Sequence, residues 1–145
     1  MKAAAFERQT RPGQFRLRRV VLQRRKQQLH RAVFQSVVND GGAVAPALWP
    51  LEVANALVVA ERKKRITAAQ REVFLKNLAR LDIEIEPLIT DRVFDEGINL
   101  ATIYHLSVYD ATYLEIAIRQ NLPIATQDEE LIRATKDVGV SLFRP

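Results

Sequence analysis

The sequence contains no cysteine among its 145 residues. This absence excludes a disulfide framework, a zinc site built on thiolates and a cysteine nucleophile. It also lacks a membrane-spanning apolar run, because the apolar stretch over residues 43–59 is interrupted by Pro46, Pro50 and Glu52. The basic N-terminus has no apolar segment of the kind that a secretory signal requires. We therefore expect a cytoplasmic protein with no membrane partner.

Acidic residues are scarce at the start of the chain. Residues 1–35 contain ten Lys and Arg and a single acid, Glu7, which gives a net charge of +9. Residues 36–145 contain twelve basic and sixteen acidic residues, a net charge of −4. The length suggests one domain, so we divide the chain into a basic leader over residues 1–35 and a domain over residues 36–145. Such a leader can bind phosphate backbones without sequence preference, or it can be only a solvated tail.

Apolar spacing and turn residues predict helices and strands in alternation. Helices are expected over residues 26–39, from residue 50 into the charged run 61–65, and over residues 67–81, 90–103, 107–118 and 128–136. Strands are expected over residues 43–45, 83–88, 122–126 and 140–143. Residues 16–25 are ambiguous, because the apolar run Val20–Leu22 favours a strand while its basic flanks do not. Strands that alternate with helices of this length indicate an α/β fold with a parallel sheet.

Three acidic residues, Glu52, Asp110 and Asp128, each occur where a helix is expected to begin. In an alternating strand–helix fold, helix N-termini gather at the carboxyl edge of the sheet, where such folds bind ligands. Three carboxylates that converge there could hold a hard divalent cation. Each acid also has a structural explanation, because a carboxylate in the first turn suits the helix dipole and can cap free N–H groups. Ser107 precedes Asp110 by three residues, and residues 126–129 form a Thr-x-x-Glu capping pattern.

Other polar residues bear on the same site. Asn55 lies three residues after Glu52 on the same helical face, where it could fix the site or be an ordinary exposed side chain. The two histidines, His30 and His105, lie in the leader and at a helix end, so a mechanism that uses two histidines is not expected.

Three segments together carry a resemblance to a known family. They are Pro-x-x-x-x-x-Glu-x-x-Asn-x-Leu over residues 46–57, Tyr-Asp-Ala-x-Tyr-Leu over residues 109–114 and Ala-Thr-x-Asp over residues 125–128. In order and spacing they resemble the PIN-domain ribonucleases, and most of all the VapC-type toxins of bacterial toxin–antitoxin pairs. The resemblance implies a PIN-like, Rossmann-like three-layer domain with a parallel sheet flanked by helices. It also implies a magnesium-dependent endoribonuclease that serves as the toxin of a type II toxin–antitoxin system.

The family's functional residues carry over onto matching positions of this chain. Glu52, Asp110 and Asp128 match three of the acids that bind magnesium in the family and catalyse cleavage, and manganese is an alternative cation. Asn55 and Thr126 would support the site. The resemblance further implies an RNA substrate, a cognate antitoxin and a homodimer.

The chain departs from the family at its first strand. That strand normally ends in Asp, whereas here no Asp precedes Asp40, and the run Val20–Leu22 is followed by Gln23 and Arg24. We therefore expect the first strand to be missing or aberrant and the first metal ligand to be absent. One alternative is a catalytically impaired PIN-like protein that binds antitoxin or RNA without cleaving. Another is a basic-arm nucleic-acid binder whose acids are only helix caps.

A one-base frame shift offers one explanation of the basic leader. Residues 18–20, Arg-Arg-Val, can be coded CGA-CGC-GTC, which reads Asp-Ala-Ser one base later. The expected consequence is a sheet that lacks or mis-forms its middle strand, because unpaired charge is costly to bury. Sequencing the first 35 codons would decide whether the leader is native.

Overall fold

The computed structural model describes residues 20–22 and 41–143. The elements along the chain are β1 (Val20–Leu22), β2 (Ala43–Pro46), α2 (Trp49–Arg62), α3 (Ala68–Leu78), β3 (Ile83–Glu86), α4 (Thr90–Arg92), the π-helix η1 (Val93–Gly97), α5 (Ile98–Tyr104), α6 (Val108–Gln120), β4 (Ile124–Ala125) and α7 (Glu129–Asp137). The predicted helix over residues 26–39 lies outside the described residues.

The strands form one parallel sheet in the order β3-β2-β1-β4. In register, Val21 lies opposite Val44 of β2, and Leu22 lies opposite Ala125 of β4. The last predicted strand, over residues 140–143, is reduced to a single parallel bridge between Leu142 and Ile124.

The strand β1 is the centre of this sheet, so the expectation that the middle strand is missing or mis-formed is wrong. Its three residues are at most 2% exposed. The basic residues that argued against a strand lie outside Val20–Leu22, and the three apolar side chains alone fill the central position. This strand lies within the segment assigned to a basic leader, and a boundary at residue 35 stays a prediction.

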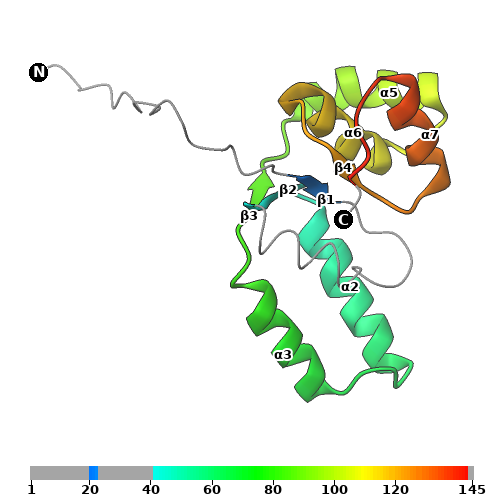
Figure 1. The fold of residues 1–145 in the computed structure, drawn as a ribbon. Coiled ribbons are helices and arrows are strands. Elements are labelled where there is room, and N and C mark those ends of the chain that lie inside the picture. Colours follow the sequence, from blue (N-terminus) through cyan, green and yellow to red (C-terminus); the bar gives the residue numbers. More distant parts are fainter. Residues whose placement is uncertain (1–19, 23–40, 144–145) are drawn as a thin grey trace, which may run out of the picture.

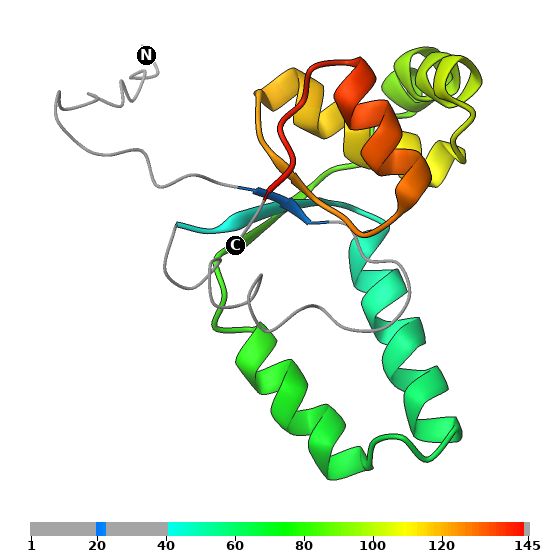
Figure 2. The same ribbon diagram turned by 45° about the vertical axis from the view of Figure 1, so that its right-hand side comes forward.

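Helices cover both faces of the sheet and complete a three-layer α/β fold. The helices α5, α6 and α7 lie on one face, and α2 and α3 extend from the other as a helical pair (Figures 1 and 2). The helix α6 is the main partner of the sheet, because it contacts β1, β2 and β4 as well as α5, η1 and α7. Its buried residues Tyr113, Leu114 and Ala117 belong to the same hydrophobic core as the strands.

The buried face of α2 is not the one that its apolar spacing favours. Leu51, Ala54, Leu57 and Val58 recur at helical spacing, but the buried residues of the helix are Trp49 and Val53, and Leu51 is 72% exposed. The helix is apolar on most sides, so helical periodicity cannot select the buried face. Only its N-terminal part lies against the sheet (Figure 1).

No helix within residues 20–22 and 41–143 combines the length and the apolar character that a bilayer crossing requires.

Candidate active site

The sheet order places two of the predicted acids on either side of the central strand. The helix α2, which carries Glu52, begins three residues after the end of β2, and Asp128 lies three residues after the end of β4. Both of these strands pair with β1. Asp110 lies in the first turn of α6, the helix that packs across β1, β2 and β4. The carboxyl edge of the sheet around β1 is therefore the candidate site.

Asp110 is a buried carboxylate held by Ser107. The residue is 4% exposed, and the Ser107 hydroxyl donates a hydrogen bond to its Oδ2. The same hydroxyl oxygen accepts the amide N–H of Asp110 at 3.1 Å, which makes Ser107 the N-cap of α6. The capping role belongs to the serine, and the serine in turn orients the aspartate.

Glu52 is joined to α6 by Tyr113. The phenol hydroxyl of Tyr113 donates a hydrogen bond to Glu52 Oε2, and Tyr113 is fully buried. Burial raises the pKa of Tyr113 far above its ordinary value, and the hydrogen bond and charge of Glu52 and the charge of Asp110 raise it further. The phenol consequently stays protonated as a donor. Asp110 and Tyr113 lie three residues apart on one face of α6, and Glu52 approaches that face through its hydrogen bond with Tyr113.

Asp128 is the N-cap of α7. Its Oδ1 accepts the amide N–H of Leu131 at 3.0 Å, and the Thr126 hydroxyl oxygen accepts the amide N–H of Asp128 at 3.0 Å. A capping box from Thr126 to Glu129 is therefore wrong, because the cap lies two residues later and Glu129 is the first helical residue. Thr126 nevertheless lies directly beside the predicted acid, as the resemblance implies.

The structure does not test the supporting role of Asn55 or the grouping of the three acids as one ligand set. Asn55 is exposed on α2, and its supporting role stays a prediction. Within residues 20–22 and 41–143, no group of three or more His, Cys, Asp or Glu is placed to hold a metal ion. The assignment of Glu52, Asp110 and Asp128 as one set of ligands thus also stays a prediction.

The donor chemistry around Tyr113 nevertheless fits a hard divalent cation. Mg²⁺ keeps several waters and is commonly bound through one or two carboxylates together with substrate phosphates. Glu52 and Asp110 supply two such carboxylates, and each is oriented by a hydroxyl donor. Two carboxylates can hold a cation weakly, but they do not form a closed cage of protein ligands.

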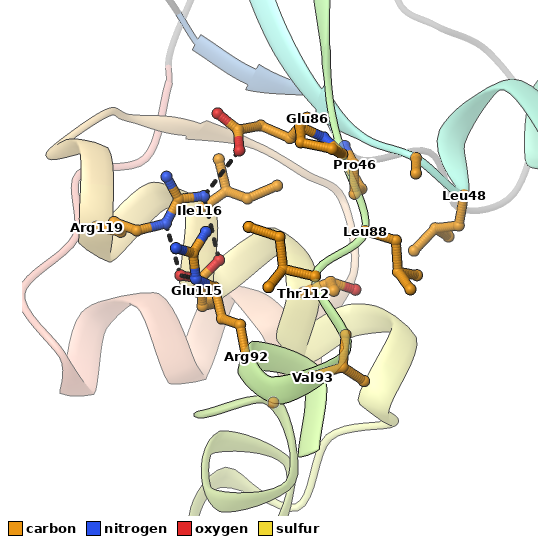
Figure 3. Close-up of a pocket in the computed structure, with 14 residues that line it drawn as sticks. Pro46, Leu48, Glu86, Leu88, Arg92, Val93, Thr112, Glu115, Ile116 and Arg119 are labelled. Carbon is orange, nitrogen blue, oxygen red and sulfur yellow. Dashed lines mark hydrogen bonds and ion pairs between the residues drawn. The ribbon is translucent and has the colours of Figure 1, made fainter. Parts of the chain in front are cut away.

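The opposite face of α6 lines a pocket at the carboxyl ends of β2 and β3 (Figure 3). Pro46 is the last residue of β2 and Leu48 follows it, Leu88 follows β3, and Thr112 and Ile116 come from α6. None of the three predicted acids lines this pocket. The helix thus separates an acidic side from a largely apolar pocket.

An ion-pair network closes one side of that pocket (Figure 3). Arg119 lies 2.7 Å from Glu115 and 3.1 Å from Glu86, and Arg92 lies 3.6 Å from Glu115. The hydrogen bond to Glu115 is the main cause of the raised pKa of Arg119. The network links β3, α4 and α6, and its side chains are occupied with one another.

Sequence reasoning did not assign a role to Tyr113. The available signal was its position three residues after Asp110 within the Tyr-Asp-Ala-x-Tyr-Leu pattern, which places the two on one helical face. Its partner Glu52 is 61 residues away in the sequence, so only the tertiary structure reveals the contact.

Together these features define the class of protein as an α/β domain that presents carboxylates at the carboxyl edge of a parallel sheet. Residues 20–137, most of the chain, match the family model described as PIN domain. The chain belongs to the PIN domain family. The matched segment begins at β1 and includes Glu52, Asp110 and Asp128. Membership implies a nuclease-type function, and PIN domains are generally metal-dependent nucleases.

A solved structure supports the same fold. The chain is similar to the protein in "Crystal structure of PAE2754 from Pyrobaculum aerophilum", with 24% sequence identity and a TM-score of 0.63. The similarity covers 83% of this chain and 81% of that chain. At this identity the likeness bears on the fold alone. A comparison with curated proteins found no match.

Proposed function

We propose that the chain is a magnesium-dependent endoribonuclease and the toxin of a type II toxin–antitoxin pair. The observation that carries the nuclease proposal is the placement of Glu52 and Asp110 around Tyr113, at the edge of the sheet where such folds bind ligands. Family membership supports the nuclease class. The toxin role rests on the resemblance of residues 36–145 to the VapC-type toxins.

The residues have separate tasks in this proposal. Asp110 is the main metal ligand, because it is buried and oriented by Ser107. Glu52 and Asp128 complete the acidic site, with Asn55 and Thr126 in support. A bound Mg²⁺ or Mn²⁺ lowers the pKa of a water and stabilises the charge on a phosphate under attack. The proposed partners are an RNA substrate, a cognate antitoxin and a second copy of the chain.

The rival function is a PIN-like protein that binds antitoxin or RNA without cleaving it. The observation in its favour is that Gln23, and not an Asp, follows β1 in the sequence. Each carboxylate missing from a Mg²⁺ site removes charge that few other groups replace. The leader, with its net charge of +9, could still attract RNA through its phosphates. Because this carboxylate is missing, we expect any cleavage by this chain to be weak.

The deciding experiment is cleavage of labelled RNA by the purified protein with Mg²⁺ or Mn²⁺, against an EDTA control. We expect weak, EDTA-sensitive cleavage that Asp110→Asn abolishes while the fold stays intact. Asp95→Asn is the matched control, because Asp95 is an exposed acid on η1 and is not one of the predicted ligands. EDTA-sensitive cleavage that Asp110→Asn leaves unchanged would show that Asp110 is not the main metal ligand and would overturn the proposal.

A second substitution separates the two functions. Gln23→Asp introduces a carboxylate directly after the last residue of β1. If the original chain binds RNA without cleaving it and Gln23→Asp gains EDTA-sensitive cleavage, the chain is the impaired form of the enzyme. Robust turnover by the original chain would show that the missing Asp is not required.

A further inference from the structure

We propose that Tyr113 is a positioning residue that orients the Glu52 carboxylate toward the divalent cation. The inference rests on the proposed function and assigns a role to a residue that the family resemblance leaves without one. Tyr113 itself would not touch the cation or the RNA.

The Tyr113 side chain joins two helices from inside the core. Tyr113 is fully buried, and its hydroxyl donates to Oε2 of Glu52, a residue in the first turn of α2. The bond therefore links α2, which follows β2, to α6, which packs across the sheet. A buried core tyrosine generally needs a partner for its hydroxyl. Here that partner is one of the predicted metal ligands.

Tyr113 lies three residues after Asp110 on α6, so the two side chains share one face of the helix. Because Tyr113 shares this face with Asp110 and donates to Glu52, one rigid ring fixes the place of the Glu52 carboxylate relative to Asp110. A flexible glutamate without this contact would adopt several rotamers, and each would place the carboxylate differently.

Ser107 and Tyr113 each donate a hydroxyl hydrogen bond to one of the carboxylates. The Ser107 hydroxyl donates to Asp110, and the Tyr113 hydroxyl donates to Glu52, so each carboxylate has one hydroxyl donor from the α6 region. Groups that hydrogen-bond to metal ligands fix their orientation, and their loss typically lowers metal affinity or activity by about 10–100-fold. We expect an effect near the lower limit, because the cation keeps most of its waters.

The test is Mn²⁺ binding to the full chain, measured by electron paramagnetic resonance of the free ion, with RNA cleavage as a second readout. Four proteins form a double-mutant cycle: the original chain, Tyr113→Phe, Glu52→Gln and the double variant. Asp110→Asn is measured beside them. We expect Tyr113→Phe to weaken Mn²⁺ binding about tenfold and to lower kcat for RNA with little change in KM. In the Glu52→Gln background the same substitution should have no further effect.

The control variant is Tyr104→Phe. Tyr104 is a partly buried tyrosine that packs against the same core from α5, so the substitution removes a hydroxyl without touching the acids. Tyr104→Phe should bind Mn²⁺ as the original chain does. Circular dichroism and thermal unfolding confirm that every variant is folded.

The outcomes distinguish this inference from the proposed function. If Mn²⁺ binding depends on Glu52 and Asp110 but is unchanged in Tyr113→Phe, the positioning role is wrong and the metal site stands. If Tyr113→Phe weakens binding equally in both Glu52 backgrounds, its role is general packing, and the inference is again wrong. If the chain binds no Mn²⁺, or if neither Glu52→Gln nor Asp110→Asn alters binding, both the inference and the proposed metal site fail.

Discussion

Ser107 and Asp110 exchange two hydrogen bonds at the start of α6. The serine Oγ accepts the amide N–H of Asp110 at 3.1 Å and donates its proton to the aspartate Oδ2. One hydroxyl therefore caps the helix and orients a buried carboxylate. The stability of α6 and the geometry of the candidate site depend on the same atom.

Ser107→Ala should lower the free energy of unfolding by about 1–2 kcal/mol, because the helix loses its N-cap and Asp110 loses a donor. Urea unfolding followed by circular dichroism measures the change. Ser107→Thr is the matched control, since it keeps the hydroxyl and should retain most of the stability. Equal stability of the alanine variant would show that water replaces the serine at no cost.

Gly42→Ala should destabilise the protein more than Gly139→Ala. Both glycines have positive φ, +100° for Gly42 and +74° for Gly139, so a Cβ strains the backbone at either position. At Gly42 the added Cβ would also lie 2.7 Å from Asp82 Oδ2 and 2.8 Å from the Asp82 carbonyl oxygen, whereas nothing lies within 4 Å at Gly139.

For Gly139→Ala we expect a loss of about 1–2 kcal/mol from the left-handed backbone alone, and for Gly42→Ala a larger loss. Urea denaturation midpoints at equal m-values provide the comparison. Similar midpoints for the two variants would mean that the turn before β2 can shift away from Asp82.

Arg119→Met should destabilise the protein by about 1–3 kcal/mol, because Glu115, only 9% exposed, would keep just the longer contact to Arg92. Arg71→Met removes the ion pair between Arg71 and Glu61. Both of these side chains are about one-third exposed, so the loss should cost less than about 1 kcal/mol. Thermal unfolding of both variants at low and high salt tests the difference. A smaller effect at Arg119 than at Arg71 would contradict the structural role of the network.

The buried phenol of Tyr113 should make stability fall at alkaline pH. Its pKa in the folded protein is raised far above 10, while the unfolded tyrosine titrates near pH 10. The contribution of Tyr113 to the free energy of unfolding is therefore complete below about pH 10. Above pH 10 the unfolded state releases a proton that the folded state retains. The free energy of unfolding should then decrease by about 1.4 kcal/mol per pH unit from this residue.

Urea unfolding between pH 9 and pH 11, with EDTA present, measures this slope. Tyr113→Phe should have a shallower slope than the original chain, whereas Tyr109→Phe, at a 69% exposed tyrosine of the same helix, should not differ from it. Equal slopes for the original chain and Tyr113→Phe would indicate that the phenol ionises normally in the folded protein.

The sequence alone determined most of the local structure. The helices expected from residues 67 and 107 begin there, because Thr67 and Ser107 cap α3 and α6 with bonds that reach only three residues along the chain. The helix expected from Pro50 begins one residue earlier, at Trp49. The parallel sheet also followed from the alternation of strands and helices. Each family motif spans only a few consecutive residues, so the sequence alone was enough to identify the acids at the helix starts.

The tertiary structure decided what depends on distant contacts. The run Val20–Leu22 became the central strand despite its basic flanks, because two strands from elsewhere in the chain pair with it and bury it. The buried face of α2 could not be read from a helix that is apolar on most sides. The bond from Tyr113 to Glu52 spans 61 residues, and only the packing of α6 against the sheet brings the two together. Local rules placed the acids at helix starts, and long-range packing determined which side chains orient them.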